Sequence, residues 1–188
     1  MRRFLLLTAG LLTLSACDRL AGPDGERKAG EPAAPTASAF AYAATGDLTG
    51  YYMPVSETRV GEWVLRDLFV GQASDFQSWT AGERSGTFAP VMLEFEDPRS
   101  PMVQTELGES RSGQVRVLPT RFEVSDDHIR FEGRSAELGP VTFDGRLDQA
   151  ALAVSRRNLG DEGAVVTGRL SAGGQHVTGV RLRWWMGD

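Results

Sequence analysis

Apolar and polar residues alternate along much of the chain, which indicates β-strands rather than helices. Residues 86–97 show the pattern clearly, because Val91, Leu93 and Phe95 fall on one face of a strand while Glu94 falls on the other. A strand places successive side chains on opposite faces, so a period of two is typical of a sheet with one buried face. The alternation predicts a mainly β fold.

A weak repeat in the second half of the chain predicts how these strands are connected. Four segments, residues 129–134, 141–147, 166–170 and 177–182, each combine β-branched or apolar residues with an internal glycine, and an arginine lies nearby. Glycine inside a strand is tolerated where a sheet bends or where another backbone approaches closely. The repeat favours a curved antiparallel meander, although Gly-Arg pairs also recur by chance in a chain rich in both residues.

These patterns together predict one folded domain over residues 46–188. It is expected to be an antiparallel sandwich or a curved, barrel-like meander of about nine strands.

Two segments have features of helices. Residues 74–79 begin with a serine that can cap a helix N-terminus. Residues 148–159 have a possible cap at each end, but Leu152 and Val154 alternate with smaller residues. We therefore favour a strand at residues 151–156 over a helix.

The last strand carries a candidate binding face. Between residues 180 and 186, Arg181, Arg183 and Trp185 fall on the face opposite the apolar residues. Arginine and tryptophan are enriched where proteins bind one another. The same face also suits a final strand whose outer side must remain soluble, and the sequence leaves both interpretations open.

The N-terminus has the pattern of an export signal. Arg2 and Arg3 precede an apolar run at residues 4–14, and Leu-Ser-Ala-Cys follows, ending at Cys17. The run is too short to cross a bilayer core of about 30 Å, which takes roughly 20 residues. Residues 14–17 resemble the lipobox of bacterial lipoproteins, in which the cysteine is lipidated and the preceding peptide is removed.

This resemblance implies a cleaved signal peptide at residues 1–16 and a covalent lipid on Cys17 as the only attached group. Two or three acyl chains on one cysteine anchor a protein far more firmly than a single chain. The domain then faces the periplasm of the bacterial envelope. Asp18 slightly favours the inner membrane over the outer one.

Residues 17–45 are expected to join the anchor to the domain as a flexible linker. The segment is rich in proline, alanine and glycine and shows no sustained period. Such a composition buries too little apolar surface to offset the entropy lost on ordering.

The charge of the chain argues against a nucleic-acid partner. The net charge of the whole chain is −5, and removal of Arg2 and Arg3 with the signal peptide takes it to about −7. Binding to phosphates requires a clustered basic face. We therefore expect no nucleic-acid partner and no polybasic contact with the membrane.

The sequence contains no recognisable catalytic or metal-binding motif. His128 and His176 lie far apart, and neither has the neighbouring ligands of a zinc site. The acids Glu94, Glu96 and Asp97 lie on or beside a strand, where a solvated outer face is the simpler interpretation. We predict that the protein is not an enzyme and has no metal site.

The leading functional hypothesis is an interaction or assembly module, held at the membrane by its lipid, that binds a protein of the envelope. The alternative is a carrier or sensor of a small apolar molecule. It requires Trp63, Phe69, Phe95, Phe143 and Trp184 to line a cavity inside the domain.

A continuous internal cavity of roughly 300 Å³ or more favours the carrier, and a filled interior favours the module. The third and weakest hypothesis is an enzyme whose Glu94, Asp97, His128 and His176 converge in one cleft.

Overall fold

The structure is a computed structural model that describes residues 39–105 and 108–187. The predicted signal peptide, lipidation at Cys17 and Asp18 lie outside the described residues, as does the predicted linker up to residue 38.

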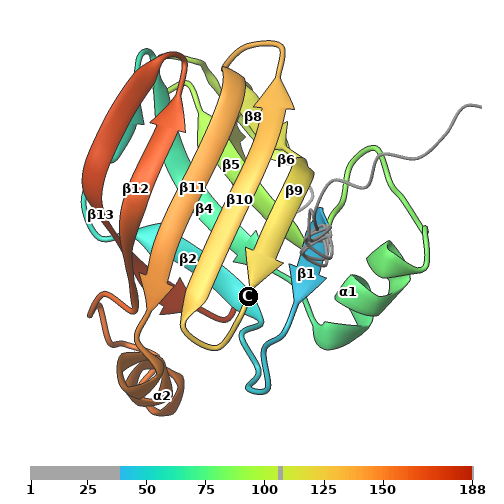
Figure 1. Cartoon of the computed structure of the whole chain (residues 1–188). Helices are drawn as coiled ribbons and strands as arrows, with labels where there is room; N and C mark the ends of the chain where they lie inside the picture. The colour runs from blue at the N-terminus through green and yellow to red at the C-terminus, as the bar shows by residue number, and fades with distance from the viewer. Residues whose placement is uncertain (1–38, 106–107, 188) are drawn as a thin grey trace, which may run out of the picture. The chain divides into compact units, whose positions relative to one another are not determined.

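Ten strands of the described chain form one curled, open sheet, a half-barrel (Figure 1). Along the sheet they follow the order β1 (Phe40–Tyr42), β9 (Pro119–Val124), β10 (His128–Ser135), β11 (Gly139–Leu147), β12 (Val166–Ala172), β13 (Gln175–Trp185), β2 (Gly50–Pro54), β4 (Trp63–Val70), β5 (Val91–Glu96) and β8 (Gln114–Val117). Neighbouring strands are antiparallel except β1 and β9, which are parallel. The mainly β prediction is confirmed, and the curved meander describes the fold.

Three further strands complete the β-structure. The two-residue strand β3 (Arg59–Val60) pairs with β4. A separate hairpin of β6 (Met102–Thr105) and β7 (Gly108–Arg111) follows β5. The described chain therefore has more strands than the nine or so that the sequence predicted.

The four repeated segments lie on β10, β11, β12 and β13, which are consecutive neighbours in the sheet. Other atoms approach closely at three of their four glycines, Gly133, Gly145 and Gly168. A Cβ atom at Gly168 would lie 2.5 Å from the carbonyl oxygen of Asp144, and one at Gly133 would lie 2.6 Å from that of Leu118. The prediction of close backbone approach is confirmed at Gly133 and Gly168. Gly179 has open space around it, and its φ of +69° occurs where β13 carries an extra residue opposite β12.

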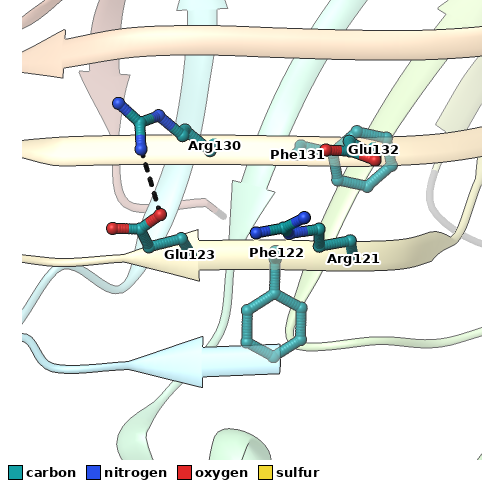
Figure 2. Close-up of a pocket in the computed structure, with 6 residues that line it drawn as sticks. All are labelled: Arg121, Phe122, Glu123, Arg130, Phe131 and Glu132. Carbon is teal, nitrogen blue, oxygen red and sulfur yellow. Dashed lines mark hydrogen bonds and ion pairs between the residues drawn. The ribbon is translucent and has the colours of Figure 1, made fainter. Parts of the chain in front are cut away.

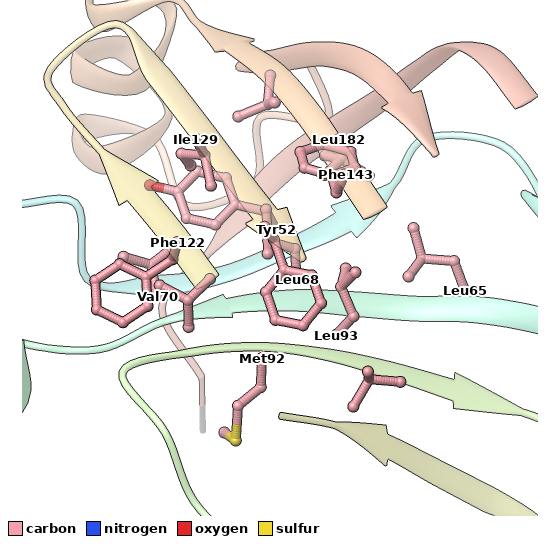
Figure 3. Close-up of a cluster of buried hydrophobic side chains, with 14 of the residues drawn as sticks. Tyr52, Leu65, Leu68, Val70, Met92, Leu93, Phe122, Ile129, Phe143 and Leu182 are labelled. Carbon is pink, nitrogen blue, oxygen red and sulfur yellow. The ribbon is translucent and has the colours of Figure 1, made fainter. Parts of the chain in front are cut away.

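The concave side of the curled sheet is filled by buried apolar side chains (Figure 3). Phe122, Phe143 and Leu182 come from three different strands, and each is at most 1 % exposed. Tyr52 is also fully buried, and its hydroxyl donates a hydrogen bond to the carbonyl oxygen of Leu48 at 2.7 Å. Burial of this kind contributes about 25 cal/mol for each Å² of apolar surface.

The helix α1 (Ala73–Thr80) confirms the prediction for residues 74–79, although the N-cap is Gln72 rather than Ser74. Phe76 and Trp79 form the buried face of α1. Phe76 stacks on Tyr42 with ring centroids 4.0 Å apart, so this helix covers the end of the sheet near β1.

The prediction of a strand at residues 151–156 is wrong. The segment forms the helix α2 (Gln149–Arg157), and its N-cap Asp148 accepts hydrogen bonds from two backbone amides of the first turn. Leu152 is buried while Val154 is 46 % exposed, so their spacing was a chance match to a period of two. The cap and the helical propensity of the alanine-rich middle outweigh that match.

The folded region also begins earlier than the predicted boundary at residue 46. β1 lies within residues that the sequence assigned to the linker, and its Phe40 packs against Phe122 with ring centroids 5.2 Å apart. Thr45 donates hydrogen bonds from its amide and hydroxyl to Asp126, at 2.9 and 2.6 Å. Three residues give too short a pattern to reveal a strand in a segment rich in alanine.

Candidate functional site: a groove on the outer face of the sheet

The candidate site is an open groove of about 920 Å³ on the convex side of β2, β4, β5 and β8, away from the core. The β6–β7 hairpin and the residues after β13 complete its walls. Its apolar lining is made by aromatic and methionine side chains: Tyr51, Met53, Phe69, Phe88, Met92, Trp185 and Met186. Side chains of these types are enriched at protein interfaces.

A bulge in β4 creates the floor of the groove. Leu65 pairs with Phe95 and Asp67 pairs with Glu94, so Arg66 is an extra residue on β4. A bulge of this kind reverses the alternation of the strand beyond it. Asp67 therefore faces the groove, together with Phe69, while Leu68 and Val70 point into the core.

Asp67 is an unusual residue at this floor. Its side chain is only 6 % exposed, and its nearest cation is the Nε atom of Arg66, at 3.7 Å from Oδ2. Asp67 accepts no hydrogen bond from any described residue. Burial, reinforced by the charge of Glu94 and opposed by Arg66 and Arg116, raises the pKa of Asp67 from 3.8 to about 7. The groove thus contains a buried carboxyl group with unused hydrogen-bonding capacity.

Glu94, by contrast, is fully engaged. Its Oε1 atom accepts a hydrogen bond from Arg116 Nη2 at 3.1 Å, and its Oε2 atom from Arg66 Nη1 at 3.5 Å. Arg116 also donates from Nη1 to the carbonyl oxygen of Thr87 at 2.9 Å. The two arginines are therefore held by Glu94, and neither donates a hydrogen bond to Asp67.

The predicted binding face on the last strand adjoins this groove. Trp185 lines the groove and lies 5.7 Å from Tyr51, measured between ring centroids. Arg183 is half-buried and points toward Met53, with its Nη2 atom 4.0 Å from the sulfur, whereas Arg181 is exposed. The three residues alternate with the buried Val180, Leu182 and Trp184, so they share the outer face of β13 as the sequence indicated.

The residues named for an internal cavity do not line one together. Phe95 and Phe143 are at most 1 % exposed and belong to the core, as does the mostly buried Trp184. Phe69 lines the outer groove, and Trp63 is half-buried at the start of β4. The core residues among them belong to one cluster of buried side chains, and the groove lies outside this cluster.

The residues named for an enzyme lie on different elements. Glu94 lies in the groove, Asp97 follows β5 and pairs with Arg99, and His176 is exposed near the start of β13. His128 Nε2 lies 2.5 Å from Asp144 Oδ1 on the outer face of β10 and β11. Burial alone would raise the pKa of Asp144, but hydrogen bonds from His128 and Arg169 lower it below its ordinary value.

A second, smaller pocket of about 220 Å³ lies over β9 and β10 (Figure 2). Arg130 Nη1 donates to Glu123 Oε2 there at 3.1 Å, and Arg121 and Glu132 lie on the same two strands. Its charged side chains are exposed, which is typical of a solvated outer face. Within residues 39–105 and 108–187 no group of three or more metal-ligating side chains is present.

Comparisons of the chain with known protein families, with curated proteins and with solved structures give no match. In the part of the chain that the structure describes, no helix has the length and apolar character needed to cross a membrane. The groove, the outer face of β13 and the N-terminal sequence are the features of the protein that bear on its function.

Proposed function

We propose that the protein is a lipid-anchored interaction module of the bacterial envelope that binds a segment of a partner protein in the outer groove. The lipobox-like sequence ending at Cys17 supports the anchor, and Asp18 favours the inner membrane. The single observation that carries the binding function is the groove of about 920 Å³ with aromatic and methionine walls on the side of the sheet away from the core.

The composition of the groove supports a protein partner. Phe88 is 40 % exposed and Met186 is 58 % exposed, although both are large and apolar. Such side chains gain from burial against a partner, and each typically contributes about 1.5–3 kcal/mol when it becomes fully buried. Arg183 extends the same surface beyond Met53, which adds a charged rim to an apolar centre, as in known interfaces.

A small apolar molecule is the second candidate occupant. The volume of the groove lies within the range of roughly 300–1,000 Å³ that is typical of small-ligand sites. The residues named for an internal cavity do not line one together, so this alternative is placed in the outer groove. The protein partner is preferred because the groove is open and continues onto the outer face of β13.

Affinity capture from solubilised envelope tests the proposal. Phe69→Ala combined with Trp185→Ala removes two walls of the groove, while Arg181→Ala combined with Arg183→Ala removes the cationic rim. Val154→Ala is the matched control, because Val154 is an exposed apolar residue on α2, outside the groove.

We expect one partner to be recovered with the wild type and the control, strongly reduced with the groove variant and weakened with the rim variant. Equal recovery with all four proteins would contradict the proposal. If the groove variant instead loses a small molecule that copurifies with the wild type, the result favours a carrier of that molecule over an interaction module.

A further inference from the structure

The floor of the groove combines a buried acid with apolar surroundings. The Asp67 side chain is more than nine-tenths buried, accepts no hydrogen bond from a described residue and faces into the groove. A buried polar group without a hydrogen bond is unfavourable by about 1–3 kcal/mol, and more when it is charged. The ion pair with Arg66 is too long, at 3.7 Å, to supply that hydrogen bond. An occupant that donates a hydrogen bond to this carboxylate removes that penalty.

The charged side chains that line the groove indicate which kind of hydrogen-bond donor can bind Asp67. Arg66 on the same strand and Arg116 on β8 both bind Glu94, and Arg66 remains 3.7 Å from Asp67. Glu109 faces the groove from the β6–β7 hairpin. With Asp67 ionised, these five side chains carry three negative charges and two positive ones. At the floor itself Asp67 and Glu94 balance the two arginines, and Glu109 at the rim gives the whole lining one net negative charge. This lining favours a cationic occupant over an anionic one, and Arg183, which lies beyond Met53, is not part of it.

The walls suit the stem of a cationic side chain. Tyr51 and Phe69 lie 5.2 Å apart between ring centroids, and Trp185 lies on the other side of Tyr51. The methylene groups of lysine or arginine pack on such apolar surfaces while the charged end reaches a polar group. Aromatic faces also attract cations within about 6 Å.

We infer that the groove recognises a lysine or arginine side chain of the partner segment, flanked by apolar residues, and that Asp67 binds its cationic end. This inference rests on the proposed function and specifies the chemistry of the partner. A charge-assisted hydrogen bond to Asp67 contributes more than a neutral one. The cationic end of the bound side chain then supplies the hydrogen bond that this carboxylate lacks.

Binding of two matched peptides tests the inference. The probe is acetyl-Phe-Lys-Phe-amide, and its control replaces lysine by norleucine, which keeps the apolar stem and lacks the charge. Affinities are measured by isothermal titration calorimetry with the mature protein in detergent micelles. We expect the lysine peptide to bind the wild type at least about tenfold more tightly than the norleucine peptide at pH 8.

Asp67→Asn is expected to abolish this preference and leave the affinity for the norleucine peptide within about twofold. Glu109→Gln removes an acid from the rim of the same groove and is expected to keep the preference. Between pH 8 and pH 6 the preference in the wild type is expected to fall about tenfold, because Asp67 becomes protonated, and Asp67→Asn removes this pH dependence.

Equal affinities for the two peptides in the wild type, no detectable binding of the lysine peptide, or a preference that survives in Asp67→Asn would each overturn the inference. Failure of this inference can be distinguished from failure of the proposed function. If the Phe69/Trp185 variant loses the partner while Asp67→Asn retains it, only the cation recognition is wrong. If the lysine preference holds while the Phe69/Trp185 variant retains the partner, only the proposed function is wrong.

Discussion

Replacement of Asp67 by asparagine is expected to stabilise the protein at neutral pH. The carboxylate is buried, lies near the like charge of Glu94, accepts no hydrogen bond from the described chain and is 3.7 Å from its nearest cation. Removal of a poorly compensated buried charge relieves a desolvation penalty. Asparagine has nearly the same size, so the groove floor keeps its shape.

The magnitude follows from the pKa of Asp67, which burial, together with Glu94, raises from 3.8 to about 7. Because the folded protein holds the proton more tightly than the unfolded chain, the free energy of unfolding falls as the pH rises between these values. The slope is about 1.4 kcal/mol for each pH unit. The free energy of unfolding at pH 8 is therefore lower by at most roughly 4 kcal/mol because of Asp67, and this reduction disappears below pH 4.

Urea denaturation of the wild type and of Asp67→Asn at pH values from 4 to 8 measures this effect. We expect the two proteins to have similar stabilities near pH 4, and the variant to become progressively more stable up to pH 8. Glu109→Gln removes a rim acid but leaves Asp67 in place, so its profile should follow that of the wild type. A difference between wild type and Asp67→Asn that does not change with pH would refute the reasoning.

Three further predictions test other parts of the structure. Gly168→Ala places a methyl group 2.5 Å from the carbonyl oxygen of Asp144. We expect this variant to lower the free energy of unfolding, measured by urea denaturation, by about 1–3 kcal/mol. Gly86→Ala is the control, because the space around Gly86 is open, and it should change the free energy of unfolding by less than about 1 kcal/mol. Asp148→Ala removes the N-cap of α2 and should cost about 1 kcal/mol in the same assay; an unchanged midpoint would argue against this cap. Cys17→Ser should leave the precursor unprocessed and without its lipid, as shown by mass spectrometry, and normal processing together with retention on membranes after an alkaline wash would contradict the lipid anchor.

The sequence was most informative where local patterns and the tertiary structure agree. The meander from β10 to β13 followed from a repeated strand pattern and from glycines such as Gly145, whose added Cβ atom would meet the ring of Phe143 at 2.6 Å. The outer face of β13 followed from simple alternation over a long strand. Both features depend on residues that are close along the chain.

The groove could not be predicted because it depends on a single extra residue. A bulge adds one position to a strand without a characteristic composition, and the change at Arg66 turns Asp67 and Phe69 outward. An Arg-Asp pair in an apolar strand is normally interpreted as a solvated edge. The groove that Asp67 faces is also lined by the β6–β7 hairpin and by Trp185, which are distant in sequence. The acid next to an arginine inside an otherwise apolar segment was the one available signal.

Crosslinking in living cells tests the central claim most directly. A photoreactive phenylalanine analogue replaces either Phe88, at the exposed rim of the groove, or Val154, which is similarly exposed on α2. We predict that irradiation joins the Phe88 form, but not the Val154 form, to one discrete envelope protein, and that Phe69→Ala in the Phe88 form abolishes the product. Equal crosslinking from both positions, or none from Phe88, would contradict a binding groove on this face of the sheet.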